Sequence, residues 1–130
     1  NVLVNALKFT ETGGVTISVS GRLKGADSVR LKISVADTGI GIVPENIDRI
    51  FKRFHQVEKG LERKYSGTGL GLSICRELVS QMGGEISVES RLNEGSCFNI
   101  EIPMPVGWPP EAVQDTIMAA DSLDTIVHAA

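Results

Sequence analysis

A run of alternate glycines directly before an apolar-periodic segment limits the fold of this chain more than any other feature. The glycines are Gly67, Gly69 and Gly71, and helical periodicity follows over residues 73–79. Glycines lack a Cβ atom and let another group approach the backbone closely, and the following helix directs unpaired N–H groups and its positive dipole end toward them. An anion such as phosphate suits this arrangement, but a tight loop packed against a neighbour explains the run alone equally well.

Composition limits the class of protein. The 130 residues suit one domain, and 42% hydrophobic with 22% charged residues is typical of a soluble globular protein. The net charge of -3 argues against a non-specific nucleic-acid binder. No apolar run has the length of a membrane span. From the charge we therefore expect no nucleic-acid partner, and from the absence of a long apolar run we expect no membrane contact for this segment.

The cysteines and the first residue indicate the cellular context. Cys75 and Cys97 lie far apart and form no C-x-x-C pair, which favours reduced thiols and a cytoplasmic location, in a parent protein that can itself be membrane-anchored. The chain begins at Asn1 within a helical pattern. We therefore expect a piece of a longer protein.

The first segment predicts a helix that ends before Gly13 and Gly14. Its core-facing side chains are Val2, Leu3, Ala6 and Phe9. Asn1 and Asn5 share one helical face, which Lys8 can join. Amide oxygens beside a lysine can hold hydrated Mg²⁺ and the phosphates that it neutralises, although a solvated polar face explains these three residues alone better.

Two alternating segments, 15–20 and 31–36, predict an antiparallel strand pair joined by a turn at 24–28. Asp37 ends the second strand and is followed by Gly39 and Gly41. A carboxylate there can accept hydrogen bonds from a flat ligand such as adenine lying over bare backbone. An Asx-type turn is the better interpretation of these residues by themselves.

The remaining periodicities complete the expected fold. Pro44 opens a short helix whose apolar stripe is expected in the core and comprises Ile47, Ile50, Phe51 and Phe54. Strands are predicted at 85–89 and 96–104. Together these elements predict a two-layer α/β sandwich with helices on one face of a mixed sheet, over residues 1–105. Residues 106–130 read as a linker or tail, with a weak helix or disorder over 112–130.

Four segments occur in a familiar order and at familiar separations. They are Asn1-x-x-x-Asn5-Ala6-x-Lys8-Phe9-Thr10, Asp37-x-Gly39-x-Gly41, Phe51-x-x-Phe54 and Gly67-x-Gly69-Leu70-Gly71-Leu72. Together they resemble the N, G1, F and G2 boxes of the catalytic ATP-binding domain of sensor histidine kinases, which belongs to the wider GHKL-type class with the Hsp90, gyrase B and MutL ATPases. The resemblance covers residues 1–104 and is specific because all four motifs occur together. It implies the Bergerat-type ATP-binding fold, here without its first elements.

The resemblance implies ATP and Mg²⁺ as cofactors and assigns roles to residues. Asp37 would bind adenine, Asn1 and Asn5 the metal, and Lys8 and Arg63 the phosphates. The catalytic residues would be Asn5, Lys8 and Arg63. The Phe51-x-x-Phe54 motif would form the base of a lid over 56–66. The complete expected binding set is Asn1, Asn5, Lys8, Phe9, Asp37, Gly39, Ile40, Gly41, Phe54, Arg63, Lys64, Gly67, Thr68, Gly69, Leu70, Gly71 and Leu72.

The implied reaction is transfer of the γ-phosphoryl group of ATP to a histidine on a separate dimerisation domain, upstream in the parent chain. A response-regulator receiver domain would be the further partner. Neither His55 nor His128 stands in the family's H-E-x-x-x-P context, so the fragment is expected to be inactive without its acceptor. The alternatives are a GHKL-type ATPase and a degenerate domain kept for protein interaction.

Overall fold

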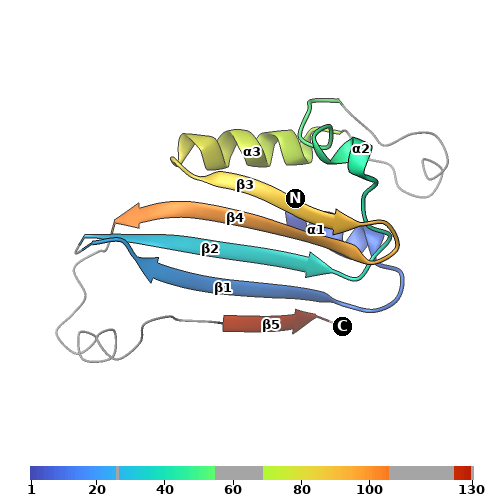
Figure 1. Cartoon of the computed structure of the whole chain (residues 1–130), viewed down its shortest axis with the longest axis horizontal. Helices are drawn as coiled ribbons and strands as arrows, with labels where there is room; N and C mark the ends of the chain where they lie inside the picture. The colour runs from blue at the N-terminus through green and yellow to red at the C-terminus, as the bar shows by residue number, and fades with distance from the viewer. Residues whose placement is uncertain (26, 55–68, 106–124, 130) are drawn as a thin grey trace.

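The computed structural model describes residues 1–25, 27–54, 69–105 and 125–129. These residues form a layer of helices on one five-stranded sheet (Figure 1). The helices are α1 (Val2–Phe9), α2 (Pro44–Ile47) and α3 (Gly71–Gln81), and the strands are β1 (Val15–Leu23), β2 (Ser28–Asp37), β3 (Glu85–Arg91), β4 (Gly95–Pro105) and β5 (Thr125–Ala129). The predicted two-layer α/β sandwich is confirmed. None of the described helices is long and apolar enough to cross a membrane.

The strand order is β3-β4-β2-β1-β5, and each neighbouring pair is antiparallel. The expectation of a mixed sheet is therefore wrong for the described strands. The helix-containing crossover does join two strands, β2 and β3, that run in the same direction. However, β4 lies between them and is antiparallel to both, so they never pair.

The core forms where one row of side chains crosses the sheet beneath the helices. Val35 of β2 is opposite Ile17 of β1 and Phe98 of β4. Val2 and Ala6 of α1 belong to the same buried cluster. Burial of this apolar row supplies the main driving force for packing the helices on this face.

The opposite face of the sheet is polar, as expected when an antiparallel sheet is covered on one side only. The Ser34 hydroxyl donates a hydrogen bond of 2.7 Å to Oδ1 of Asn99 across β2 and β4. Arg30 and Glu101 form an ion pair of 3.5 Å on the same two strands. The alternation of apolar and polar residues along each strand therefore fixes which side chains face the helices.

The aromatic pair after α2 separates into one core residue and one surface residue. Phe51 is 8% exposed and meets the Phe98 ring edge-on, with 6.4 Å between ring centroids. Phe54 is 75% exposed and has a φ of 60°, so the prediction that it lies in the core is wrong. The α-helix ends at Ile47, and helical spacing no longer determines which face Phe54 occupies.

The end of the chain also differs from expectation. Residues 125–129 were expected in a weak helix or disorder, but they form β5 and pair with the first five residues of β1. Thr125, Ile126 and Val127 are β-branched residues that favour strands, and the edge of β1 offers unpaired backbone groups. The domain boundary at 105 remains a prediction.

Candidate functional site

The polar face of α1 lies against the start of α3. The backbone N–H of Asn5 donates to the carbonyl of Asn1 at 3.0 Å, which places both residues in one helical turn. A Cβ built on Gly71 would lie 3.0 Å from Oδ1 of Asn1. The first asparagine and the last glycine of the run, distant in sequence, are thus neighbours in space.

A second contact joins the end of α1 to the loop after β2. The N–H of Ile40 donates to the carbonyl of Phe9 at 3.2 Å. A Cβ built on Gly39 would lie only 2.2 Å from that same carbonyl oxygen. Position 39 therefore needs glycine because the backbone of α1 occupies the space of a side chain.

Asp37 stands at the end of β2 and holds this loop with one of its two oxygens. Its Oδ1 accepts a hydrogen bond of 2.9 Å from the N–H of Gly39, which is the Asx-type turn that the sequence left open. The turn uses only this oxygen, so Oδ2 takes no part in it. One oxygen thus fixes the turn while the other can accept a hydrogen bond from a ligand, so the two interpretations are compatible.

The β3–β4 hairpin supports the loop from the other side. Gly41 has a φ of +67°, and a Cβ there would lie 1.9 Å from the carbonyl oxygen of Arg91. The N–H of Asn93 donates to the carbonyl of Ile40 at 2.8 Å. The second glycine of the motif is therefore required by contact with the hairpin, independently of any ligand.

Sequence reasoning missed the hydroxyl that completes this support. The N–H of Ile42 donates to Oγ of Ser90 at 2.8 Å, and that hydroxyl donates in turn to the carbonyl of Gly95 at 2.8 Å. Ser90 thus joins the loop to the hairpin. The turn residues at 93–95 were visible in the sequence, but their contact with a loop near residue 40 was not.

The described part of the glycine run forms the beginning of α3. Gly69 has a φ of +68°, and its carbonyl accepts a hydrogen bond of 3.1 Å from the N–H of Phe54. Leu70 precedes the helix without a side-chain cap, and its carbonyl accepts the Ser73 hydroxyl at 2.8 Å. The first N–H groups of any α-helix lack intrahelical partners, and those of α3 lie at the end of the helix that meets Asn1.

The remaining expected residues fall into two groups. Lys8 is half-buried, with its ammonium 5.2 Å from the ring centroid of Phe9, and Leu72 packs against the core. The others lie outside the described residues: Arg63, Lys64, Gly67, Thr68, the expected lid at 56–66, and His55. Among the described residues there is also no cluster of three or more His, Cys, Asp or Glu that could bind a metal. Amide oxygens are the candidate protein ligands.

Comparison with known proteins gives a consistent result. The family model described as histidine kinase-, DNA gyrase B-, and HSP90-like ATPase matches residues 1–106. The chain is 51% identical over 104 residues to the sensor histidine kinase AruS of Pseudomonas aeruginosa, and 46% identical over 104 residues to the sensor histidine kinase RcsC of Escherichia coli. Each match covers 80% of this chain and 10% of the relative, so the chain spans about a tenth of their length.

Solved structures agree with this relationship. Full-length ShkA in complex with AMPPNP matches with a TM-score of 0.65 and 37% identity, over 85% of this chain and 21% of that one. The nucleotide-free catalytic domain of the histidine kinase ThkA matches with a TM-score of 0.54 and 33% identity, over 78% of this chain and 61% of that one. This chain therefore belongs to the histidine kinase-, DNA gyrase B-, and HSP90-like ATPase family.

Proposed function

We propose that this chain binds Mg-ATP as the catalytic domain of a sensor histidine kinase, from which the γ-phosphoryl group passes to a histidine on a separate domain. The observation that carries the proposal is the meeting of three motifs. Asn1 lies against Gly71, and the carbonyl of Phe9 lies against Gly39. The names of the relatives and the AMPPNP complex of a structural neighbour support the same function.

The residues have distinct roles in this proposal. Oδ2 of Asp37 accepts a hydrogen bond from the exocyclic amine of adenine, and Gly39 and Gly41 let the loop that follows Asp37 pack against α1 and the β3–β4 hairpin. The first N–H groups of α3 bind phosphate, because a helix N-terminus attracts anions. Lys8, Arg63 and Lys64 neutralise phosphate charge. Positioning and charge neutralisation are the main contributions that a protein makes to phosphoryl transfer.

Asn1 and Asn5 would hold the Mg²⁺ ion. The described residues offer amide oxygens on one helical face and no cluster of metal-binding side chains. This fits an ion that keeps several waters and takes most other ligands from substrate phosphates. When bound, Mg²⁺ would neutralise charge on the β- and γ-phosphates.

The partners follow from the length of the relatives. AruS and RcsC are sensor histidine kinases, and this chain matches only 10% of each. We therefore assign the accepting histidine to a dimerisation domain elsewhere in the parent protein and the next transfer to a receiver domain. The segment would act in the cytoplasm.

Asn1 distinguishes a kinase from an ATPase. The ATPases of this wider class typically carry a glutamate at the corresponding position, which activates the attacking water. An amide has no site to take up a proton at neutral pH, so Asn1 can orient water but is no general base. Transfer to histidine is thus expected to dominate over hydrolysis.

Two measurements on the same protein test this function. The chain is incubated with ATP labelled at the γ-phosphate, with and without the dimerisation domain of its parent protein, while phosphate release and label on the acceptor are followed. We expect label on the acceptor histidine and slow phosphate release without it. Rapid turnover without acceptor would support the ATPase, and absence of Mg-ATP binding by calorimetry would support a degenerate interaction domain.

The Asn1→Glu variant sharpens the comparison. A carboxylate at this position supplies the missing general base, so phosphate release is expected to rise while acceptor labelling falls. Gln81→Glu, at the exposed C-terminal end of α3, is the matched control for the added charge. If both variants leave phosphate release unchanged, Asn1 does not face the attacking water.

A further inference from the structure

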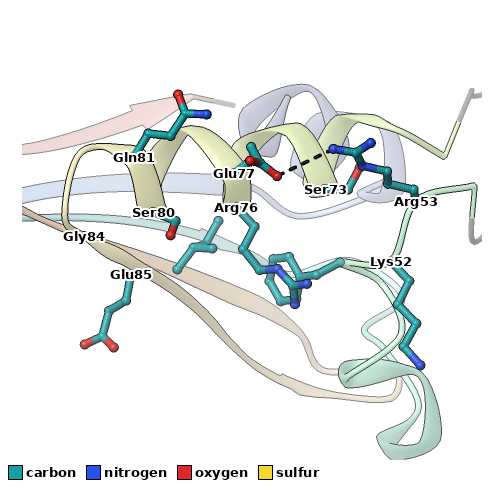
Figure 2. A pocket seen from close by; sticks show the side chains of 11 residues that line it. Lys52, Arg53, Ser73, Arg76, Glu77, Ser80, Gln81, Gly84 and Glu85 are labelled. Carbon is teal, nitrogen blue, oxygen red and sulfur yellow. Dashed lines mark ion pairs between the residues drawn. The ribbon is translucent and has the colours of Figure 1, made fainter.

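A pocket of about 770 Å³ lies along the side of α3 that faces β3 and the segment after α2 (Figure 2). Its volume is in the range of ligand sites. It contains none of the residues assigned above to nucleotide binding. The lining residues that decide its chemistry are Phe51, Lys52, Arg76, Glu77, Glu85 and Ile86.

Arg76 is the central group of this pocket. Its guanidinium lies 5.7 Å from the ring centroid of the buried Phe51, in cation–π geometry. A guanidinium stacked on a ring still presents N–H donors at its edge. No carboxylate among the described residues lies within ion-pair distance of Arg76. The pocket thus combines an apolar floor with a cation that no described carboxylate pairs.

The other charges are arranged unevenly around Arg76. Arg53 and Glu77 form an exposed ion pair of 3.6 Å at one rim. Figure 2 shows Arg76 descending from α3 between Lys52 on one side and Glu85 on the other. Lys52 has no carboxylate partner among the described residues. A ligand carboxylate therefore fits at the Arg76–Lys52 end. The positive charge there contrasts with the net charge of the whole chain, which is -3.

The pocket continues past Arg76 into a second hollow of about 300 Å³. The two share Phe51, Arg76 and Ile86, and the second adds Ile47 and Val88 as apolar lining. Asp48 also lines it and disfavours a second acidic group there. Arg76 therefore stands where the two hollows of an elongated groove meet, beside the apolar side chains of Phe51 and Ile86 that both hollows share.

The strand that borders this groove is at the edge of the sheet. β3 is the outermost strand on this side, so no described strand pairs with its outer edge. Extended peptides commonly lie along such edges, where pockets for alternate side chains give specificity. The elongated shape and the free edge favour an extended peptide over a compact ligand.

We propose that this groove binds an extended segment of a partner protein in which apolar residues stand two positions before and two positions after an acidic residue, so that all three side chains share one face, with the carboxylate on Arg76 and the apolar side chains on Phe51 and Ile86. The site is separate from the nucleotide site and does not depend on its assignment. A charge-assisted, bidentate hydrogen bond gives the carboxylate its specificity.

The test uses a capped five-residue peptide of sequence leucine-serine-glutamate-serine-leucine, whose leucine and glutamate side chains share one face when extended, and a second peptide with glutamine in place of glutamate. Binding to the 130-residue chain is followed by nuclear magnetic resonance titration. We expect saturable shifts at Arg76, Phe51 and Ile86 with the glutamate peptide, and affinity roughly tenfold weaker for the glutamine peptide. Arg76→Gln should abolish this preference, and Arg76→Lys should restore it in part.

Arg22→Gln is the matched control, because Arg22 is exposed on β1 away from the groove and its substitution changes the charge equally. Circular dichroism establishes that each variant is folded. Equal affinity for the two peptides, or an Arg22→Gln effect as large as that of Arg76→Gln, would overturn the proposal. An absence of saturable shifts would also overturn it. A loss of Mg-ATP affinity in Arg76→Gln would assign the pocket to the nucleotide instead.

Discussion

Asp37→Asn is the substitution that tests the nucleotide site most directly. The structure predicts that the fold tolerates it, because the Oδ1 that accepts the Gly39 N–H at 2.9 Å is kept by an asparagine. The second oxygen is replaced by an NH₂ group. The proposed hydrogen-bond acceptor for the adenine amine thus becomes a donor that would face another donor, and the negative charge is lost.

The expected magnitude follows from this exchange. Hydrogen bonds to charged groups contribute about 1.5–3 kcal/mol. Because 1.4 kcal/mol corresponds to tenfold in affinity, Asp37→Asn should weaken binding of a non-hydrolysable Mg-ATP analogue by about tenfold to a hundredfold. Isothermal titration calorimetry measures the affinity, and thermal unfolding monitored by circular dichroism should show nearly unchanged stability.

Asp27→Asn supplies the control, because Asp27 is exposed in the turn between β1 and β2 and its substitution removes the same charge. It should leave affinity unchanged. Equal affinity of Asp37→Asn and the unmodified chain would refute the assignment of Oδ2 to adenine. A large loss of stability would show instead that the carboxylate charge, rather than the Asx-type turn, holds the loop.

Three further outcomes are expected. Gly41→Ala should lower the free energy of unfolding, measured in urea, by several kcal/mol more than Gly25→Ala. Both glycines have positive φ, but only at position 41 would a Cβ lie against backbone, 1.9 Å from a carbonyl oxygen. Equal losses of stability in the two variants would contradict this. Burial, followed by the charge of Glu89, raises the pKa of the Cys97 thiol. Cys97 should therefore be alkylated more slowly than a free thiol at pH 8. Glu89→Gln should increase the alkylation rate of Cys97, which mass spectrometry measures. Truncation after residue 124 removes β5 and should increase amide hydrogen exchange over residues 15–19, which pair with β5. Unchanged protection of these amides would show that β5 does not pair with β1.

The sequence by itself determined the local elements and the residue types at the site. Alternation predicted β1, β2, β3 and β4, because a strand with one buried face repeats every two residues, and helical spacing predicted α1 and α3 in the same way. The order of the four motifs also indicated which residues belong to one site. The periodicities and the individual motifs each lie within a few neighbouring residues, whereas the order of the motifs carries information through its resemblance to a family.

Only the tertiary structure decided which of these elements meet. Periodicity reports that a face is apolar but not what covers it, so the position of β4 between β2 and β3 and the pairing of β5 with β1 were not readable. The support of the Asp37 loop by Ser90 joins segments that are far apart in sequence. The same holds for Arg76, whose place over Phe51 arises because α3 packs beside the segment after α2. These features depend on packing between distant segments, and a local pattern carries no record of such contacts.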